Sequence, residues 1–118
     1  MKASIEYENE EYQRLGSVVT NNGYSDWATH DIPATYKYMW YRLSRRENDF
    51  FIETSVDGVG FHQMRVLHLY KADNEISFGI YAASPIDHSF TAKFSNMEMT
   101  ECKWNKWSAK DTGFNETK

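Results

Sequence analysis

The stretch YMWYRLSRRENDFFIETSVDGVGFHQMR, residues 38–65, predicts three β-strands joined by two turns. The turn signals are Glu47-Asn48-Asp49 and the glycine-containing segment 57–60. The middle run alternates between two sets of side chains: Phe50, Ile52 and Val56 on one side, and Phe51, Glu53 and Ser55 on the other. This is the period of a strand with one buried and one available face.

The first run of this stretch also alternates, with Trp40 and Arg42 opposite Tyr41 and Leu43. We therefore expect Trp40 and Arg42 to share a sheet face with Glu53, where a ring, a cation and an acid stand together. Such a face differs from a plain solvated one. The functional interpretation of the chain depends on it.

Size and composition favour a single all-β domain. The chain has 118 residues, which is enough for one domain with a hydrophobic core. Phe, Tyr and Trp make up 16% of the residues and fall in strand-like runs. Large aromatic side chains of this kind are typical of strands that fill a sandwich core.

The rest of the chain continues the strand pattern. Four further strands are predicted, at residues 2–8, 14–21, 75–84 and 89–99. Asn21-Asn22-Gly23 is a strong turn signal. The irregular segment 24–35 contains Pro33, so we expect it to be an ordered loop that crosses an end of the sheet. Seven strands without helices imply an antiparallel β-sandwich.

The domain boundary is placed near residue 100. Residues 1–100 form the predicted sandwich and residues 101–118 a C-terminal extension, with disorder expected after about Ala109. Trp104, Trp107 and Phe114 stand among polar residues there, so part of the extension could pack onto the domain. In the last predicted strands, Gly79 suggests a bulge or a close approach of another backbone.

Charge and cysteine content exclude several classes. The net charge of −4 gives no field that would attract nucleic acid. Cys102 is the only cysteine, so no internal disulfide forms, which fits a reducing compartment. There is no apolar run long enough to span a membrane and no apolar leader, so we expect a cytoplasmic chain. The four histidines lack metal-ligand spacing, and no metal or cofactor is expected.

Several motifs together resemble a known family. They are KASIEY (2–7), SVVTNNGYSDW (17–27), WYRLSRR (40–46), FIETSVDGVGF (51–61), FGIYAASP (78–85) and FTAKF (90–94). In this order they resemble concanavalin A-like jelly-roll domains, and more narrowly an uncharacterised domain-of-unknown-function group labelled "regulation of enolase protein". The resemblance covers roughly Lys2 to Met99.

One departure from the family pattern bears on assembly. The family domain carries a whole first half before the segment that corresponds to Lys2, so the chain resembles the second half only. A partial sandwich leaves open sheet edges and an uncovered apolar face. We therefore expect a homo-oligomer, most simply a dimer that joins sheets.

Jelly-roll lectins and glucanases bind sugars on their concave sheet, so the resemblance implies a carbohydrate or similar polyol as ligand. The candidate ligand-binding residues are Trp40, Arg42, Glu53, Gln63, Arg65, Tyr81, Glu6, Asp26 and Trp27. Alternatively, Trp40 belongs to the core and Arg42 pairs with Glu53 only to stabilise the sheet. An interaction module without a small ligand is a second alternative. A sugar-active enzyme is a third, but the E-x-D-x-x-E motif of such enzymes is absent and no catalytic residue is assigned.

Overall fold

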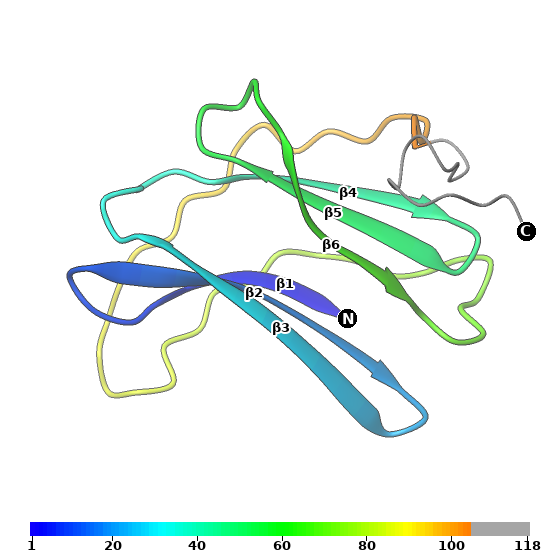
Figure 1. Cartoon of the computed structure of the whole chain (residues 1–118), viewed down its shortest axis with the longest axis horizontal. Coiled ribbons are helices and arrows are strands. Elements are labelled where there is room, and N and C mark those ends of the chain that lie inside the picture. Colours follow the sequence, from blue (N-terminus) through cyan, green and yellow to red (C-terminus); the bar gives the residue numbers. More distant parts are fainter. Residues whose placement is uncertain (105–118) are drawn as a thin grey trace, which may run out of the picture.

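Two three-stranded antiparallel sheets face each other in a computed structural model, which describes residues 1–104 (Figure 1). The strands are β1 (Lys2–Tyr7), β2 (Tyr12–Asn21), β3 (Tyr24–Pro33), β4 (Trp40–Arg46), β5 (Asp49–Ser55) and β6 (His62–His68). One sheet has the order β1-β2-β3 and the other β4-β5-β6. The described residues contain no helix. The prediction of an all-β sandwich is confirmed.

The β2–β3 hairpin follows from its turn, but it corrects the prediction for residues 24–35. Asn22 and Gly23 both have positive φ, 53° and 81°, which is the geometry of a two-residue hairpin turn. The expected loop is instead the strand β3, paired with β2 along its whole length. Pro33 is tolerated because it is the last residue of the strand, opposite Tyr12.

The three strands predicted within residues 38–65 form the second sheet. On β5, Phe50 and Ile52 are buried as expected, and Thr54 continues their side. Val56 does not, because β5 ends at Ser55 and Val56 lies exposed in the following turn. Ser55 is buried because its hydroxyl caps this turn, accepting from Gly58 N at 2.9 Å and donating to the Asp57 carboxylate at 2.9 Å.

The core lies where β2 of one sheet packs on β5 and β6 of the other. Its buried members are Val19, Phe50, Ile52 and Leu67, with Ala3, Met64 and Leu69 packed around them. Asn21 ties the sheets together at one end. Its side chain donates to His68 O at 2.9 Å and accepts from Tyr70 N at 2.6 Å.

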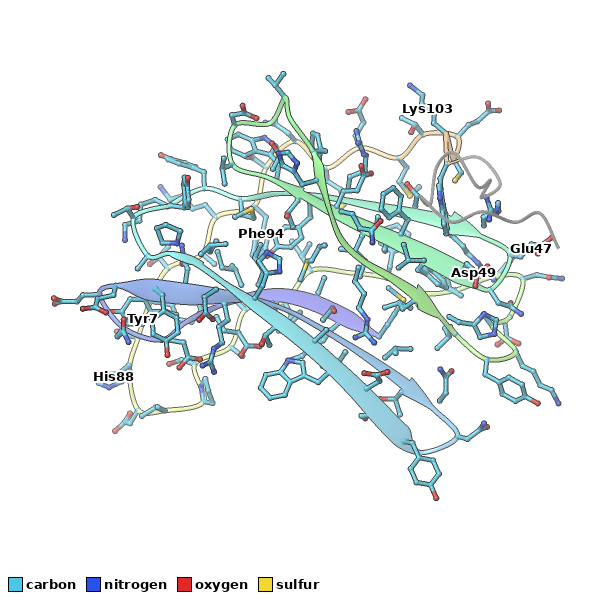
Figure 2. All side chains as sticks on the ribbon, in the orientation of Figure 1. Tyr7, Glu47, Asp49, His88, Phe94 and Lys103 are labelled. Carbon is cyan, nitrogen blue, oxygen red and sulfur yellow. The ribbon has the colours of Figure 1, made fainter. Side chains whose placement is uncertain are left out.

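Residues 75–84 and 89–99 are not strands, contrary to the prediction. They run along the molecule and back as extended chain (Figure 1), and His88 lies on the loop between them, at the opposite end from Asp49 (Figure 2). Apart from a bond between His88 and Ile86, residues 75–104 make no backbone–backbone hydrogen bond with the described residues. The apolar alternation is present, but a strand also needs a neighbour for its N–H and C=O groups.

The start of the C-terminal extension packs onto the domain. Trp104 lies 5.4 Å from Phe51, ring centre to ring centre, and Arg46 lies 4.6 Å above the Trp104 ring. Trp107, Phe114 and the boundary near Ala109 lie outside the described residues. Both sheets follow the order of the chain, so residues 1–104 contain no Greek-key connection, and the jelly roll stays a prediction.

Candidate functional site

Four of the predicted residues stand together on the face of sheet β4-β5-β6 that points away from the core, here called the outer face. Arg42 on β4 lies opposite Glu53 on β5, and Glu53 lies opposite Gln63 on β6. Trp40 lies two residues before Arg42 on the same side of β4. A cation, an acid and an amide therefore form one row across three strands.

A β-bulge puts Gln63 into this row. The register shifts between Ile52 and Glu53, so Gln63 pairs with Glu53 whereas Arg65 pairs with Ile52. Without the bulge, Gln63 and Arg65 would share a face, since they are two residues apart. The extra residue sends Gln63 to the outer face and Arg65 to the core side.

Arg42 and Glu53 form a two-pronged ion pair. Arg42 Nε and Nη2 lie 2.7 and 2.8 Å from the two carboxylate oxygens of Glu53. The guanidinium also lies 4.1 Å above the centre of the Phe61 ring. The hydrogen bond to Glu53 raises the pKa of Arg42. The pairing that was one alternative for these residues is thus present, and it holds both groups in fixed geometry.

Aromatic side chains flank the row on both sides, along the direction of the strands. On one side, Phe61 accompanies Trp40, whose indole packs against Gly58. On the other side, Phe51 packs against Trp104. Trp40 is 38% exposed, and Gln63 is exposed as well. The outer face therefore presents charged and amide groups between rings, of which Trp40 is exposed and the others are half-buried.

Arg65 and Asp26 lie elsewhere, at a cleft between the two sheets. Arg65 Nη2 is 3.3 Å from the Asp26 carboxylate, and Nη1 donates to Ser17 O at 3.1 Å. The cleft has a volume of about 390 Å³ and is bordered by β2, β3 and β6. These bonds join the sheets, and they occupy the Arg65 guanidinium.

The last three predicted residues lie away from both sites: Tyr81 beside β4, and Glu6 and Trp27 on sheet β1-β2-β3. Tyr81 lies on the extended segment after β6, close to Tyr41 of β4. Burial, and to a lesser extent Tyr81, raise the pKa of the Tyr41 phenol. Glu6 accepts a hydrogen bond from Ser4 at 2.9 Å. Trp27, 60% exposed, lies over Gly16 on the far side of the other sheet. The structure thus brings together four of the nine predicted residues and separates the remaining five.

The comparisons with known proteins give a family. The sequence profile of a family described as "Protein of unknown function (DUF1349)" matches residues 1–102. The chain belongs to this family. No curated protein and no solved structure gave a match.

In this DUF1349 member, sequence reasoning missed the aromatic residues that flank the row. Phe61 precedes Gln63 by two residues, so the strand period could have placed it on the same side had β6 been extended to it. Trp104 gave no such signal, because its contact with Phe51 joins positions more than fifty residues apart.

The described residues of this family member contain neither a group of metal ligands nor a membrane-spanning helix. Within residues 1–104 no three His, Cys, Asp or Glu side chains are grouped so that they could hold a metal ion. No helix in the described part is long and apolar enough to cross a membrane. The one acidic side chain in the loop after β5, Asp57, is bonded within its own turn.

Proposed function

We propose that this DUF1349 domain binds a carbohydrate or similar polyol on the outer face of sheet β4-β5-β6. One observation carries the proposal, the in-register row of Arg42, Glu53 and Gln63 between two groups of aromatic rings. A pyranose has apolar C–H faces and a rim of hydroxyls. Rings stack on the former, and charged or amide groups bond the latter.

The ion pair favours binding because it is ordered before a ligand arrives. Glu53 uses both carboxylate oxygens on Arg42 and its side chain is only 12% exposed, so its part in the proposal is to hold the more exposed Arg42 in place. Arg42 Nη1 has no partner among residues 1–104, and it can donate to a hydroxyl. Since neither side chain must be ordered on binding, little conformational entropy is lost.

Two broader inferences belong to the same proposal. The resemblance to concanavalin A-like domains supports a jelly-roll relationship, in which sugar binding on a sheet face is a common use. A chain with a single cysteine, Cys102, suits a reducing compartment, which supports a cytoplasmic location.

The proposal is tested with an array of neutral oligosaccharides, followed by calorimetry with the best-bound member. Trp40→Ala removes the exposed ring, and Gln63→Ala removes an exposed amide without touching the core. We expect each variant to bind at least about fivefold more weakly, because a stacked ring or a good hydrogen bond contributes about 1 kcal/mol or more.

Trp27→Ala is the matched control, since it removes another exposed indole from the opposite sheet. It should bind the same oligosaccharide with unchanged affinity. The proposal fails if the native protein retains no oligosaccharide on the array. It also fails if Trp27→Ala abolishes binding while Trp40→Ala and Gln63→Ala leave it intact, since the ligand would then occupy the other sheet.

A further inference from the structure

The segment 75–84, EISFGIYAAS, exposes both its backbone and its apolar side chains. Phe78 is 60% exposed and Ile80 57%, and Ile76 and Tyr81 are exposed as well. No backbone–backbone hydrogen bond joins this segment to any described residue. An extended, apolar stretch with unpaired N–H and C=O groups is a template for another strand.

The segment is held extended at its start by β4. The Arg45 guanidinium donates to the carbonyl oxygen of Asn74 at 3.1 Å and also to that of Asp73. Further along, Tyr81 lies close enough to Tyr41 of β4 to affect its pKa. Pairing with an incoming strand would therefore order little additional chain, so its entropic cost is reduced.

The sequence of the segment is complementary to itself in antiparallel pairing. With Gly79 opposite Gly79 of another copy, Phe78 faces Ile80 and Ile76 faces Ala82, so the apolar sides of both copies are continuous. No charged residue occurs between Glu75 and Asp87, and Glu75 would face Ala83. No like charges meet in this register.

Gly79 suits the centre of such a pair. A Cβ built there would meet no atom within 4 Å, so the position is open on the chain's own side. Glycine within a strand often marks the place where another backbone approaches closely. A two-fold axis through this residue would generate an interface in which each copy contributes the same surface.

We propose that two copies of the chain associate by antiparallel pairing of residues 75–84 about Gly79. Ile76, Phe78 and Ile80, which share one side of the segment, together expose about 300 Å² per copy, taking about 200 Å² for each whole side chain. Pairing covers at most about 600 Å² of this in the dimer, and the paired backbones add to it, which places the contact among the small, reversible interfaces below about 1,200 Å². This assembly is independent of the polyol proposal.

The first test is the mass of the full chain in solution, measured by analytical ultracentrifugation across the micromolar range. The native protein should sediment as a dimer, and Ile80→Lys as a monomer, because two lysine side chains would face the apolar surface of the partner. Ile86→Lys is the matched control. Ile86 is equally apolar and 69% exposed but lies outside the pairing segment, so this variant should remain a dimer.

The second test fixes the register through a disulfide. In a Cys102→Ser background, Gly79→Cys should form a covalent dimer on mild oxidation, because facing residues in antiparallel strands have Cα atoms about 4.5–5.5 Å apart, within disulfide range. Ser25→Cys, exposed on β3, should stay uncrosslinked under the same conditions.

A native protein that is monomeric throughout the concentration range overturns the proposal. So does a dimer that persists in Ile80→Lys, since the copies would then meet through another surface. A native dimer in which Gly79→Cys does not crosslink overturns the register. The Gly79→Cys result does not depend on whether Ile80→Lys folds.

Discussion

At the scale of single residues, Gly58 decides where the Trp40 ring can lie. Gly58 has a φ of +76°, and a Cβ there would come within 2.9 Å of the Trp40 indole. Glycine is therefore required twice, once for the backbone conformation and once for the contact. The turn that contains it is closed by Asp57, whose carboxylate accepts from Val59 N at 2.8 Å and Gly60 N at 2.9 Å.

These turn bonds give Asp57 a structural role. Hydrogen bonds from the Val59 and Gly60 N–H groups, and one from Ser55, lower the pKa of the Asp57 carboxyl. The charged form is the one that the turn binds, so the carboxylate oxygen Oδ1 is occupied by the protein's own donors. Its role is to hold the loop against which Trp40 packs.

Gly58→Ala should therefore destabilise the protein and displace Trp40. We expect a loss of about 1–3 kcal/mol in the free energy of unfolding, from backbone strain plus the forced movement of the ring. Denaturant unfolding measures the loss, and Trp fluorescence reports the ring. Oligosaccharide binding on the outer face should weaken as well.

Gly23→Ala is the control for this substitution. Gly23 has a φ of +81° but nothing within 4 Å of a Cβ, so alanine there causes the backbone strain without any steric contact. It should cost less than Gly58→Ala and leave ligand binding unchanged. Equal losses in stability and in binding would show that Gly58 does not act through Trp40.

At the scale of elements, Asn21 joins the end of β2 to the end of β6. Its side-chain amide forms hydrogen bonds with His68 O and Tyr70 N, which lie at and just beyond the end of β6 in the other sheet. Together with the bonds of Arg65 to Ser17 and Asp26, these two bonds supply the polar contacts that fix the two sheets to each other beside the small core.

Asn21→Ala should lower the free energy of unfolding by about 1–2 kcal/mol, since two hydrogen bonds are lost and each contributes about 1 kcal/mol. Asn21→Asp should lose less, because it keeps the acceptor for Tyr70 N but not the donor to His68 O. Thr20→Ala, which removes only an exposed bond to Ser25, should change stability by less than about 0.5 kcal/mol. A loss in Thr20→Ala as large as in Asn21→Ala would contradict this role for Asn21.

The elements also show what sequence patterns can and cannot predict. Residues 38–65 were predictable because alternation, turn residues and hairpin pairing are all local there. The strand β3 was not, because its irregular pattern reflects an edge strand exposed on nearly all its residues. Its partner β2, rather than its own alternation, makes it a strand. Residues 75–84 show the reverse, since they have the alternation but no neighbour.

The candidate site, like the fold, was predictable only where the pattern is local. Strand period placed Trp40, Arg42 and Glu53 on one face from sequence. The separation of Gln63 from Arg65 depends on a bulge, and no residue in HQMRV signals its position. Trp27, Glu6 and Asp26 were assigned with the others because sequence does not reveal on which sheet a strand lies, or which of its faces is covered.

At the scale of the whole molecule, the core is small for the amount of apolar side chain present. Four buried side chains form its centre, while Phe78, Phe90 and Phe94 remain more than half exposed. Phe94 lies on the returning extended segment (Figure 2). Hydrophobic burial is the main favourable contribution to folding, so covering such surface should stabilise the fold appreciably.

The stability of the native protein should therefore depend on its concentration. If folding is coupled to pairing of two copies, a hundredfold increase in concentration contributes about 2.7 kcal/mol per dimer, which raises Tm by about 5 °C for a dimer of this size. Scanning calorimetry at several concentrations measures the shift. In Ile80→Lys the Tm should be lower and independent of concentration, whereas Ile86→Lys should follow the native protein. A native Tm that does not change with concentration would mean that each copy folds alone, and that its exposed apolar surface contributes nothing to stability through association.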